Sequence, residues 1–176
     1  MIETKRLLIR HFYENDTEKC WQSWGKDISL GQYIHPYPVA DIQYMGNLVH
    51  EFVSNINAWV IGDKQSEKIV GYITVDVPFE QLGIGEIGYV IGEKYQKHGY
   101  AREAVSGILT EYLVNRNFYL MEAKCNETNT SSRKLLEQAG FLAEGRLRSR
   151  RMNLLTGERN DLLVFSITRD EFLELS

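Results

Sequence analysis

The stretch that decides the fold is Gln96-Lys97-His98-Gly99-Tyr100-Ala101, which stands between a β-rich run and a helical run. The preceding residues, 86–91, contain the β-type residues Tyr89, Val90 and Ile91 and are a strand candidate. From residue 101 to residue 113, apolar side chains recur at the i, i+3, i+4, i+7 spacing of one buried helix face. The stretch therefore predicts a strand, a short loop and a helix in immediate succession.

The residue types in this loop suit an anionic ligand. The first turn of a helix presents unpaired N–H groups and the positive end of its dipole. Gly99 and the small Ala101 let a ligand approach the backbone, and Lys97, His98 and Arg102 add donors and positive charge. These properties favour a pyrophosphate cradle. The alternative is an ordinary basic turn between a strand and a helix.

The remaining periodicities place further elements on both sides of this unit. Upstream, they predict a strand at 7–9, a helix through 17–24, an amphipathic helix over 42–56, and a hairpin of strands 58–61 and 69–77. Downstream, they predict a strand at 120–125, a helix that ends at Gly140, and a final hairpin of strands 141–152 and 160–168. Strands alternate with helices only in the second half, so we expect a mixed sheet rather than a fully parallel one.

The glycine pattern Gly83-Ile84-Gly85-Glu86-Ile87-Gly88 matches a dinucleotide-binding fingerprint in its letters only. That fingerprint must follow a strand and open a helix. Here the glycines lead into β-type residues, so we interpret them as a loop that enters a strand.

Composition narrows the class of protein. The chain has 176 residues, 43% of them hydrophobic and 25% charged, which is typical of one globular domain spanning residues 1–176. The net charge of −4 argues against a protein that coats nucleic acid. Two cysteines, Cys20 and Cys125, neither form a disulfide framework nor show metal-ligand spacing. We therefore expect no metal. No stretch is long and apolar enough to span a membrane, and no signal peptide is evident, so we expect a cytoplasmic protein.

Several segments together resemble the GNAT superfamily of N-acetyltransferases. Residues 96–101 match its Q/R-x-x-G-x-G/A signature, with alanine where many members carry glycine. Residues 3–10 and 86–89 are similar to the branch that includes ribosomal-protein N-acetyltransferases, as are Asn129-x-x-Ser132 and residues 136–141. The resemblance implies an α+β fold: a mixed, mostly antiparallel sheet that splays where the cofactor enters, with helices on both faces.

The resemblance also assigns roles to residues. It implies that acetyl-CoA is the co-substrate and that the backbone of Tyr89, Val90 and Ile91 holds its pantetheine arm. Asn129 would bond the pantetheine or acetyl end. The signature residues would hold the pyrophosphate, mostly through backbone N–H groups: Gln96, Lys97, His98, Gly99, Tyr100 and Ala101.

Two side chains are candidates for the chemistry. Glu86 is the candidate base that removes a proton from the acceptor amine, directly or through a water. Its alternative is a strand-edge glutamate that holds the acceptor's ammonium or a neighbouring lysine. Ser132 is the candidate acid for the departing thiolate, with capping of the helix that follows as the simpler interpretation.

The acceptor and the partners stay open at this level. We expect transfer to a primary amine, with the N-terminal amine of a ribosomal protein as one candidate. A polyamine, an antibiotic or another small amine is the alternative, and a non-catalytic acyl-CoA-binding regulatory module is a second. We expect neither direct nucleic-acid binding nor membrane binding, and we leave a homodimer open.

Arg146, Arg148 and Arg150 suit an anionic surface but are more typical of a solvated strand face. The aromatic residues Trp24, Tyr33, Tyr37 and Phe52 suit an acceptor cleft but are more typical of a core.

Overall fold

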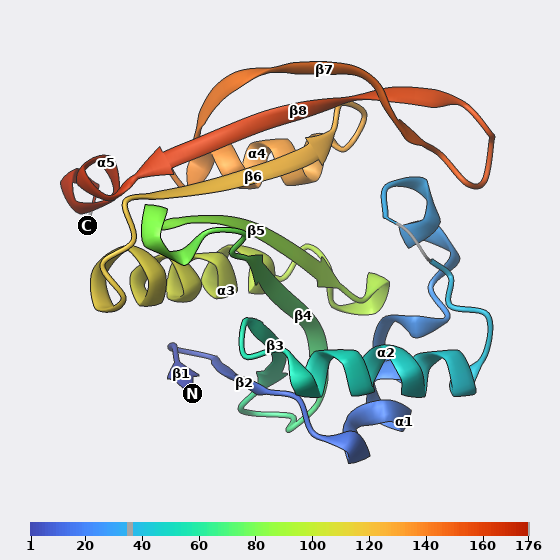
Figure 1. Cartoon of the computed structure of the whole chain (residues 1–176). Coiled ribbons are helices and arrows are strands. Elements are labelled where there is room, and N and C mark those ends of the chain that lie inside the picture. The colour runs from blue at the N-terminus through green and yellow to red at the C-terminus, as the bar shows by residue number, and fades with distance from the viewer. Residues whose placement is uncertain (35–36, 176) are drawn as a thin grey trace.

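A mixed sheet forms the centre of the computed structural model, which describes residues 1–34 and 37–175. Within these residues the strand order is β1-β2-β3-β4-β5-β6-β8-β7 (Figure 1). The strands are β1 (Ile2–Glu3), β2 (Leu7–His11), β3 (Ala58–Asp63), β4 (Ile69–Asp76), β5 (Ile84–Ile91), β6 (Leu120–Asn126), β7 (Leu142–Met152) and β8 (Arg159–Thr168). Neighbouring strands are antiparallel except β5 and β6, which are parallel.

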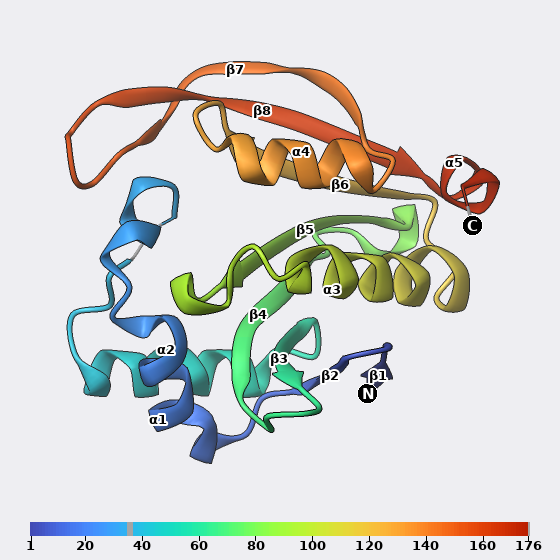
Figure 2. The same ribbon diagram turned by 180° about the vertical axis from the view of Figure 1, so that it is seen from behind.

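Helices cover the sheet on both sides (Figures 1 and 2). They are α1 (Thr17–Cys20), α2 (Ile42–Ser54), α3 (Tyr100–Leu109), α4 (Thr130–Gln138) and α5 (Arg169–Glu174). Wider helical turns extend α1 over Trp21–Gly25 and α3 over Thr110–Asn115. The mixed, mostly antiparallel sheet with helices on both faces confirms the predicted fold class.

The strands bury alternate residues on opposite faces, which creates two separate cores. In β3, Trp59 and Ile61 join one cluster, and Ala58 and Val60 join the other. The first cluster, which we call the α3 core, includes the buried face of α3 together with Leu136 of α4. The second, the α2 core, takes residues from α1, α2 and the turns that follow α1. The alternation follows from the two-residue period of a strand.

The sheet splays between β5 and β6. Their parallel pairing runs only from Ile84 opposite Leu120 to Ile87 opposite Ala123. Beyond those pairs β5 continues to Ile91 and β6 continues to Asn126. Two strand ends therefore diverge and leave backbone groups of 88–91 facing an opening, as the resemblance to the acetyltransferases implied.

Some local features differ from the expectations. A strand, β5, follows Gly83 as expected, but Gly85 and Gly88 lie within that strand rather than in a loop before it. The short elements β1 and α5 were not predicted. All of β7 is exposed, and β7 is the outer strand of the sheet. No helix among the described residues is long and apolar enough to cross a membrane.

Candidate functional site

The loop after β5 has an unusual backbone. Gly99 precedes α3 as its N-cap with a φ of +79°, and Lys97 has a φ of +64°. A lysine in the left-handed region is uncommon, and alternating left-handed residues turn successive N–H groups toward a common point that favours anions. The N–H of Glu103 makes the first helical bond, to the carbonyl of Gly99. The N–H groups before it lie in the first turn, where a helix provides no internal partner.

Several side chains of the loop bind the protein itself. The Nε2 of Gln96 donates to the carbonyl of Ile91 (3.1 Å), which ties the loop to the end of β5. The Nδ1 of His98 lies 3.2 Å from the carbonyl of Tyr95. The hydroxyl of Tyr100 donates to Oδ2 of Asp63 (2.8 Å). These three side chains fix the loop, so its backbone is what remains for a ligand.

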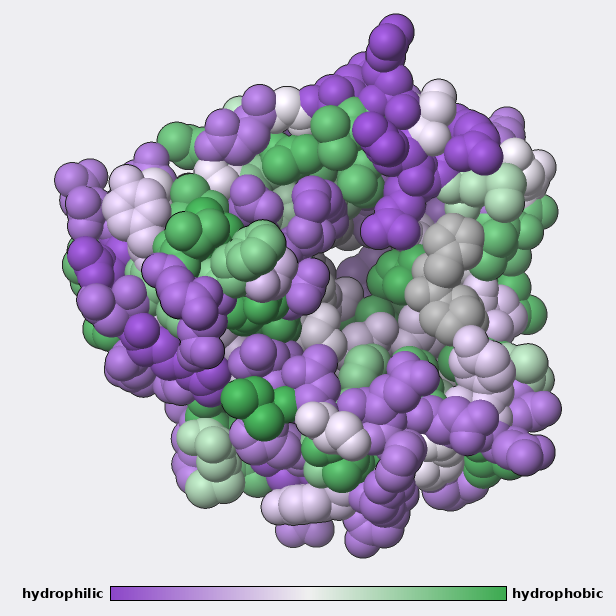
Figure 3. Space-filling model, in the orientation of Figure 1, coloured by the Kyte–Doolittle hydropathy of each residue, from purple (hydrophilic) through white to green (hydrophobic). Residues whose placement is uncertain are grey.

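A large cavity joins this loop to the splayed strands. It has a volume of about 1010 Å³ and is lined by the loop, the diverging ends of β5 and β6, and the start of α4. Figure 3 shows a face of the molecule that is hollowed near its middle. Three cationic side chains line the cavity around the loop and α4: Lys97, Arg102 and Lys134. The site thus combines unpaired N–H groups, a helix N-terminus and positive charge, which together fit a pyrophosphate.

Asn129, Ser132 and Tyr89 meet where the opening between β5 and β6 begins to widen. Asn129 is the N-cap of α4, and its Oδ1 accepts from the N–H of Ser132 (3.0 Å). The hydroxyls of Tyr89 and Ser132 form a hydrogen bond of 2.7 Å. The interpretation of Ser132 as the helix cap is therefore wrong, because Asn129 supplies that bond three residues earlier. Burial raises the pKa of Tyr89 to about 12, so this phenol is neutral at physiological pH.

Glu86 already has a cationic partner. Its carboxylate forms an ion pair with the Nζ of Lys124 on the neighbouring strand β6. The expectation that Glu86 holds a neighbouring lysine is confirmed, although both side chains keep contact with solvent. An acceptor ammonium that bound Glu86 would have to share it with Lys124.

Sequence reasoning missed three residues of β4 that line the cavity beside β5. Tyr72, Thr74 and Asp76 line the same cavity. They stand directly opposite Val90, Gly88 and Glu86 of β5. No sequence signal marks them, since their pattern is that of any strand. We call this β4–β5 surface the cavity floor. The carboxylates of Asp76 and Glu86 belong to residues that lie directly opposite each other on it.

The aromatic and arginine residues that suited an acceptor cleft or an anionic surface lie in different parts of the fold. Trp24 and Tyr37 are buried in the α2 core, as expected of most aromatics, whereas Tyr33 lines the cavity. On exposed β7, Arg146 forms ion pairs with Glu127 and Asp161. Arg151 of the same strand lines the cavity. Among the described residues no group of three or more histidines, cysteines or carboxylates is arranged to hold a metal ion.

Comparisons with known proteins agree with this geometry. The chain is 26% identical over 174 residues to the uncharacterized N-acetyltransferase p20 of Bacillus licheniformis, with 96% of each chain covered. It resembles a solved GNAT-family acetyltransferase from Bacillus anthracis with a TM-score of 0.85 and 26% identity, over 96% of this chain and 98% of that one.

Two more distant structures share the fold. One is a ribosomal L7/L12 alpha-N-protein acetyltransferase in complex with CoA (TM-score 0.85, 17% identity, 96% of this chain and 97% of the other). The other is a spermidine N-acetyltransferase from Vibrio cholerae (TM-score 0.83, 17% identity, 97% and 99%). The family model for the acetyltransferase (GNAT) domain matches residues 6–142. With its splayed sheet and the loop at 96–101, this chain belongs to the GNAT family and is an N-acetyltransferase.

Proposed function

We propose that the chain, as one domain, transfers an acetyl group from acetyl-CoA to a primary amine through the cavity between β5 and β6. The observation that carries this proposal is the loop 96–101 before the N-terminus of α3, which opens onto the ends of β5 and β6 where these strands no longer pair with each other. GNAT enzymes use acetyl-CoA, which supplies an activated acetyl thioester. In this chain the N–H groups from Lys97 to Ala101 hold the pyrophosphate, and the backbone of Tyr89, Val90 and Ile91 holds the pantetheine arm.

The amide of Asn129 has a divided role in this proposal. Its Oδ1 caps α4, which leaves the Nδ2 group to donate toward the pantetheine or acetyl end. The cap fixes the side chain in one orientation, so that donor is held in place before the ligand arrives. A backbone N–H at the end of β5 polarises the thioester carbonyl.

Glu86 carries the acid–base chemistry in our proposal. The acceptor must be a neutral amine, and an α-amine with a reference pKa near 7.7–8.0 loses its proton far more readily than a lysine amine near 10.4. Glu86 takes that proton, directly or through a water. Lys124 already forms an ion pair with this carboxylate, so an ammonium anchored there would have to compete with Lys124.

Ser132 and Tyr89 serve the leaving group. Their hydrogen-bonded hydroxyls form a chain that can donate a proton to the departing thiolate. The phenol stays protonated at neutral pH because burial raises its pKa to about 12. A thiolate leaves readily, so positioning of the amine contributes more to the rate than this proton does.

The acceptor we favour is a protein N-terminus, supported by the resemblance of residues 3–10 and 86–89 to the ribosomal-protein branch and by the lower pKa of an α-amine. The second candidate is a polyamine. It is supported by Asp76, a second carboxylate opposite Glu86 on the cavity lining, which would hold a second ammonium.

A panel assay tests the proposed function. Thioester consumption is measured with acetyl-CoA against peptides with free N-termini, the same peptides with blocked N-termini, and spermidine. Turnover that requires the free α-amine supports the first candidate, and turnover with spermidine alone supports the second. Binding of acetyl-CoA without turnover of any amine would favour the non-catalytic acyl-CoA-binding module instead.

A further inference from the structure

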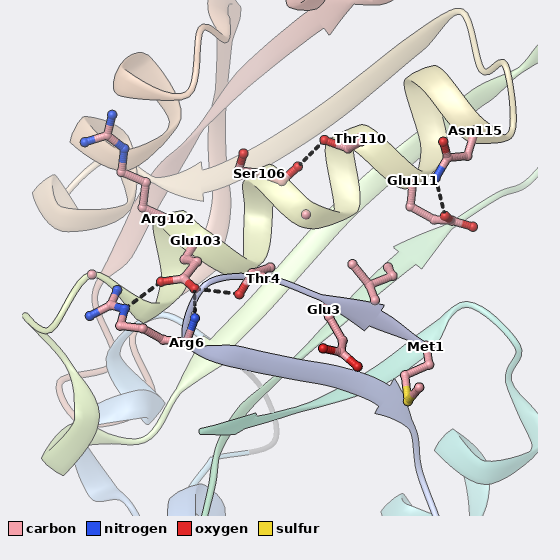
Figure 4. Close-up of a pocket in the computed structure, with 13 residues that line it drawn as sticks. Met1, Glu3, Thr4, Arg6, Arg102, Glu103, Ser106, Thr110, Glu111 and Asn115 are labelled. Atoms are coloured by element: carbon pink, nitrogen blue, oxygen red, sulfur yellow. Dashed lines mark hydrogen bonds and ion pairs between the residues drawn. The ribbon is translucent and has the colours of Figure 1, made fainter. Parts of the chain in front are cut away.

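A cluster of side chains behind the loop belongs to neither the cavity floor nor the proposed acid–base groups. It consists of Thr4 and Arg6, around the start of β2, and Glu103 in the first turn of α3 (Figure 4). The Oγ1 of Thr4 donates to Oε1 of Glu103 (2.5 Å), and the backbone N–H of Arg6 donates to the same oxygen (2.6 Å). The Nε of Arg6 donates to Oε2 (2.6 Å). Both carboxylate oxygens of Glu103 are thus held by the N-terminal segment.

The guanidinium of Arg6 also reaches the phosphate loop. Its Nη1 donates to the carbonyl of His98 (2.8 Å). Its Cζ lies 5.0 Å from the centre of the Tyr100 ring. Its Nη2 lies 3.3 Å from the point where a Cβ on Gly99 would stand. The side chain of Arg6 therefore contacts His98 and Tyr100, on either side of Gly99, and also Glu103. Arg6 and Glu103 lie 97 positions apart in the sequence.

The direction of the His98 carbonyl fixes the direction of the next N–H. In a trans peptide the C=O and the following N–H lie in one plane and point in opposite directions. Because the carbonyl of His98 points to Arg6, the N–H of Gly99 points away from Arg6. Gly99 lines the cavity, as do Lys97 and Tyr100. We call the contacts of Arg6 with Glu103 and with the carbonyl of His98 the clamp. The clamp thus turns the N–H of Gly99 away from β2 and holds it there before any ligand binds.

Electrostatics supports a clamp that persists at physiological pH. Burial raises the pKa of Glu103, but the hydrogen bonds from Thr4 and Arg6 outweigh burial and lower it overall. Glu103 is therefore ionised well below neutral pH. Its side chain is 17% exposed, against 43% for Arg6, so the carboxylate is the fixed half of the pair.

We propose that Arg6 is a positioning residue for the pyrophosphate cradle, acting through Glu103 and the carbonyl of His98 rather than by contact with phosphate. This inference rests on the proposed function, because it requires that loop 96–101 bind the pyrophosphate of acetyl-CoA. The guanidinium of Arg6 is planar and has several donors in a fixed arrangement, so it can bind Glu103 and the carbonyl of His98 at the same time. A lysine at position 6 would keep the charge but could not span both acceptors.

The test measures CoA binding by calorimetry in four variants: Arg6→Gln, Arg6→Lys, Glu103→Gln and the double Arg6→Gln/Glu103→Gln. We expect each to weaken CoA binding about 10-fold or more, since a misplacement of ~1 Å costs up to ~100-fold. The double variant should be no weaker than the weaker single variant, because both changes release the same clamp. Arg116→Gln is the matched control: it breaks an Arg–Glu ion pair with Glu111 in the helical turn that extends the same helix.

A second ligand separates positioning of the loop from general damage. Pantetheine lacks the pyrophosphate, so its weak binding, followed by nuclear magnetic resonance, should stay within about twofold of wild type in every variant. If Arg6→Lys or Glu103→Gln binds CoA as tightly as wild type, the clamp does not position the cradle. If pantetheine binding falls as much as CoA binding, the effect is structural and the inference is wrong.

The outcomes also distinguish this inference from the proposed function. Failure of the wild-type protein to bind CoA would overturn both. Wild-type binding with unaffected variants would overturn the clamp alone. Glu103→Gln keeps the shape of the side chain, so it provides the test should Arg6→Gln fail to give a folded protein by circular dichroism.

Discussion

Replacing Gly99 by alanine tests the cradle at its most constrained position. Gly99 has a φ of +79°, a region that costs an L-residue about 1–2 kcal/mol. The added Cβ would lie 3.3 Å from the Nη2 of Arg6, so that side chain must shift by a few tenths of an ångström. At about 2–4 °C per kcal/mol for a chain of this size, we expect the Tm to fall by about 2–8 °C.

The same change should weaken acetyl-CoA binding beyond this loss of stability. Relaxing Gly99 rotates the peptide whose N–H faces the cavity, and we expect about a 10-fold rise in Kd. Ligand stabilisation follows RT ln(1 + [L]/Kd), so at a fixed, saturating acetyl-CoA concentration it should shrink by about 1.4 kcal/mol. The rise in Tm on adding acetyl-CoA should therefore be smaller by about 3–6 °C than in wild type.

Gly157 provides a matched control for this experiment. It has a φ of +74° in the β7–β8 connection, and no atom lies within 4 Å of an added Cβ. Gly157→Ala should lose similar stability and keep the full acetyl-CoA-induced rise in Tm. Differential scanning fluorimetry with and without acetyl-CoA measures both quantities. An identical ligand-induced rise in Gly99→Ala and Gly157→Ala would refute the placement of the pyrophosphate on this loop.

Three further predictions concern the other polar contacts. Glu86→Gln should lower kcat about 100- to 10,000-fold at constant acetyl-CoA affinity, whereas a raised amine KM with preserved kcat would show an anchor instead of a base. Ser132→Ala should cost about 1 kcal/mol in urea unfolding by removing the partner of Tyr89, and adding Tyr89→Phe should recover part of that loss; strictly additive costs would contradict the coupling. Tyr100→Phe should destabilise the protein more at pH 7 than at a pH below the folded pKa of Asp63. The hydrogen bond from Tyr100 lowers the pKa of Asp63, so this stabilisation is present above the unfolded value near 3.9 and is lost as pH falls through the lower folded value. Equal destabilisation at both pH values would exclude that linkage.

The sequence predicted the loop at 96–101 and the helix that follows it because their signal is local. A glycine before an amphipathic run indicates a loop and a helix N-terminus from neighbouring residues alone, and Gly99 and α3 are found there. The longer strands and α2 were predicted for the same reason, since period-2 and period-3.6 patterns extend over many residues.

Contacts between distant segments could not be predicted in this way. The sequence offers no reason to connect Arg6 with His98, because only the completed sheet brings β2 beside α3. Ser132 and Asn129 show the limit at short range: both are good capping residues, and the choice between them depends on the exact start of α4. Two-residue β1 is too short for any periodicity to appear.

The two separate cores have a consequence for how the chain tolerates change. Met45 and Val49 of α2 pack in the α2 core, whereas Val105 and Ile108 of α3 pack in the α3 core on the other side of the sheet. A volume change in one cluster is absorbed by the helices of that cluster, because the strands between them form a stiff hydrogen-bonded layer. The segments around Leu30 and Tyr33, which line the cavity from the α2 side, can therefore diverge in sequence without disturbing the helix that begins at the cradle. Such an arrangement would let the residues that line the cavity from the α2 side change while the loop that we propose for acetyl-CoA keeps its backbone.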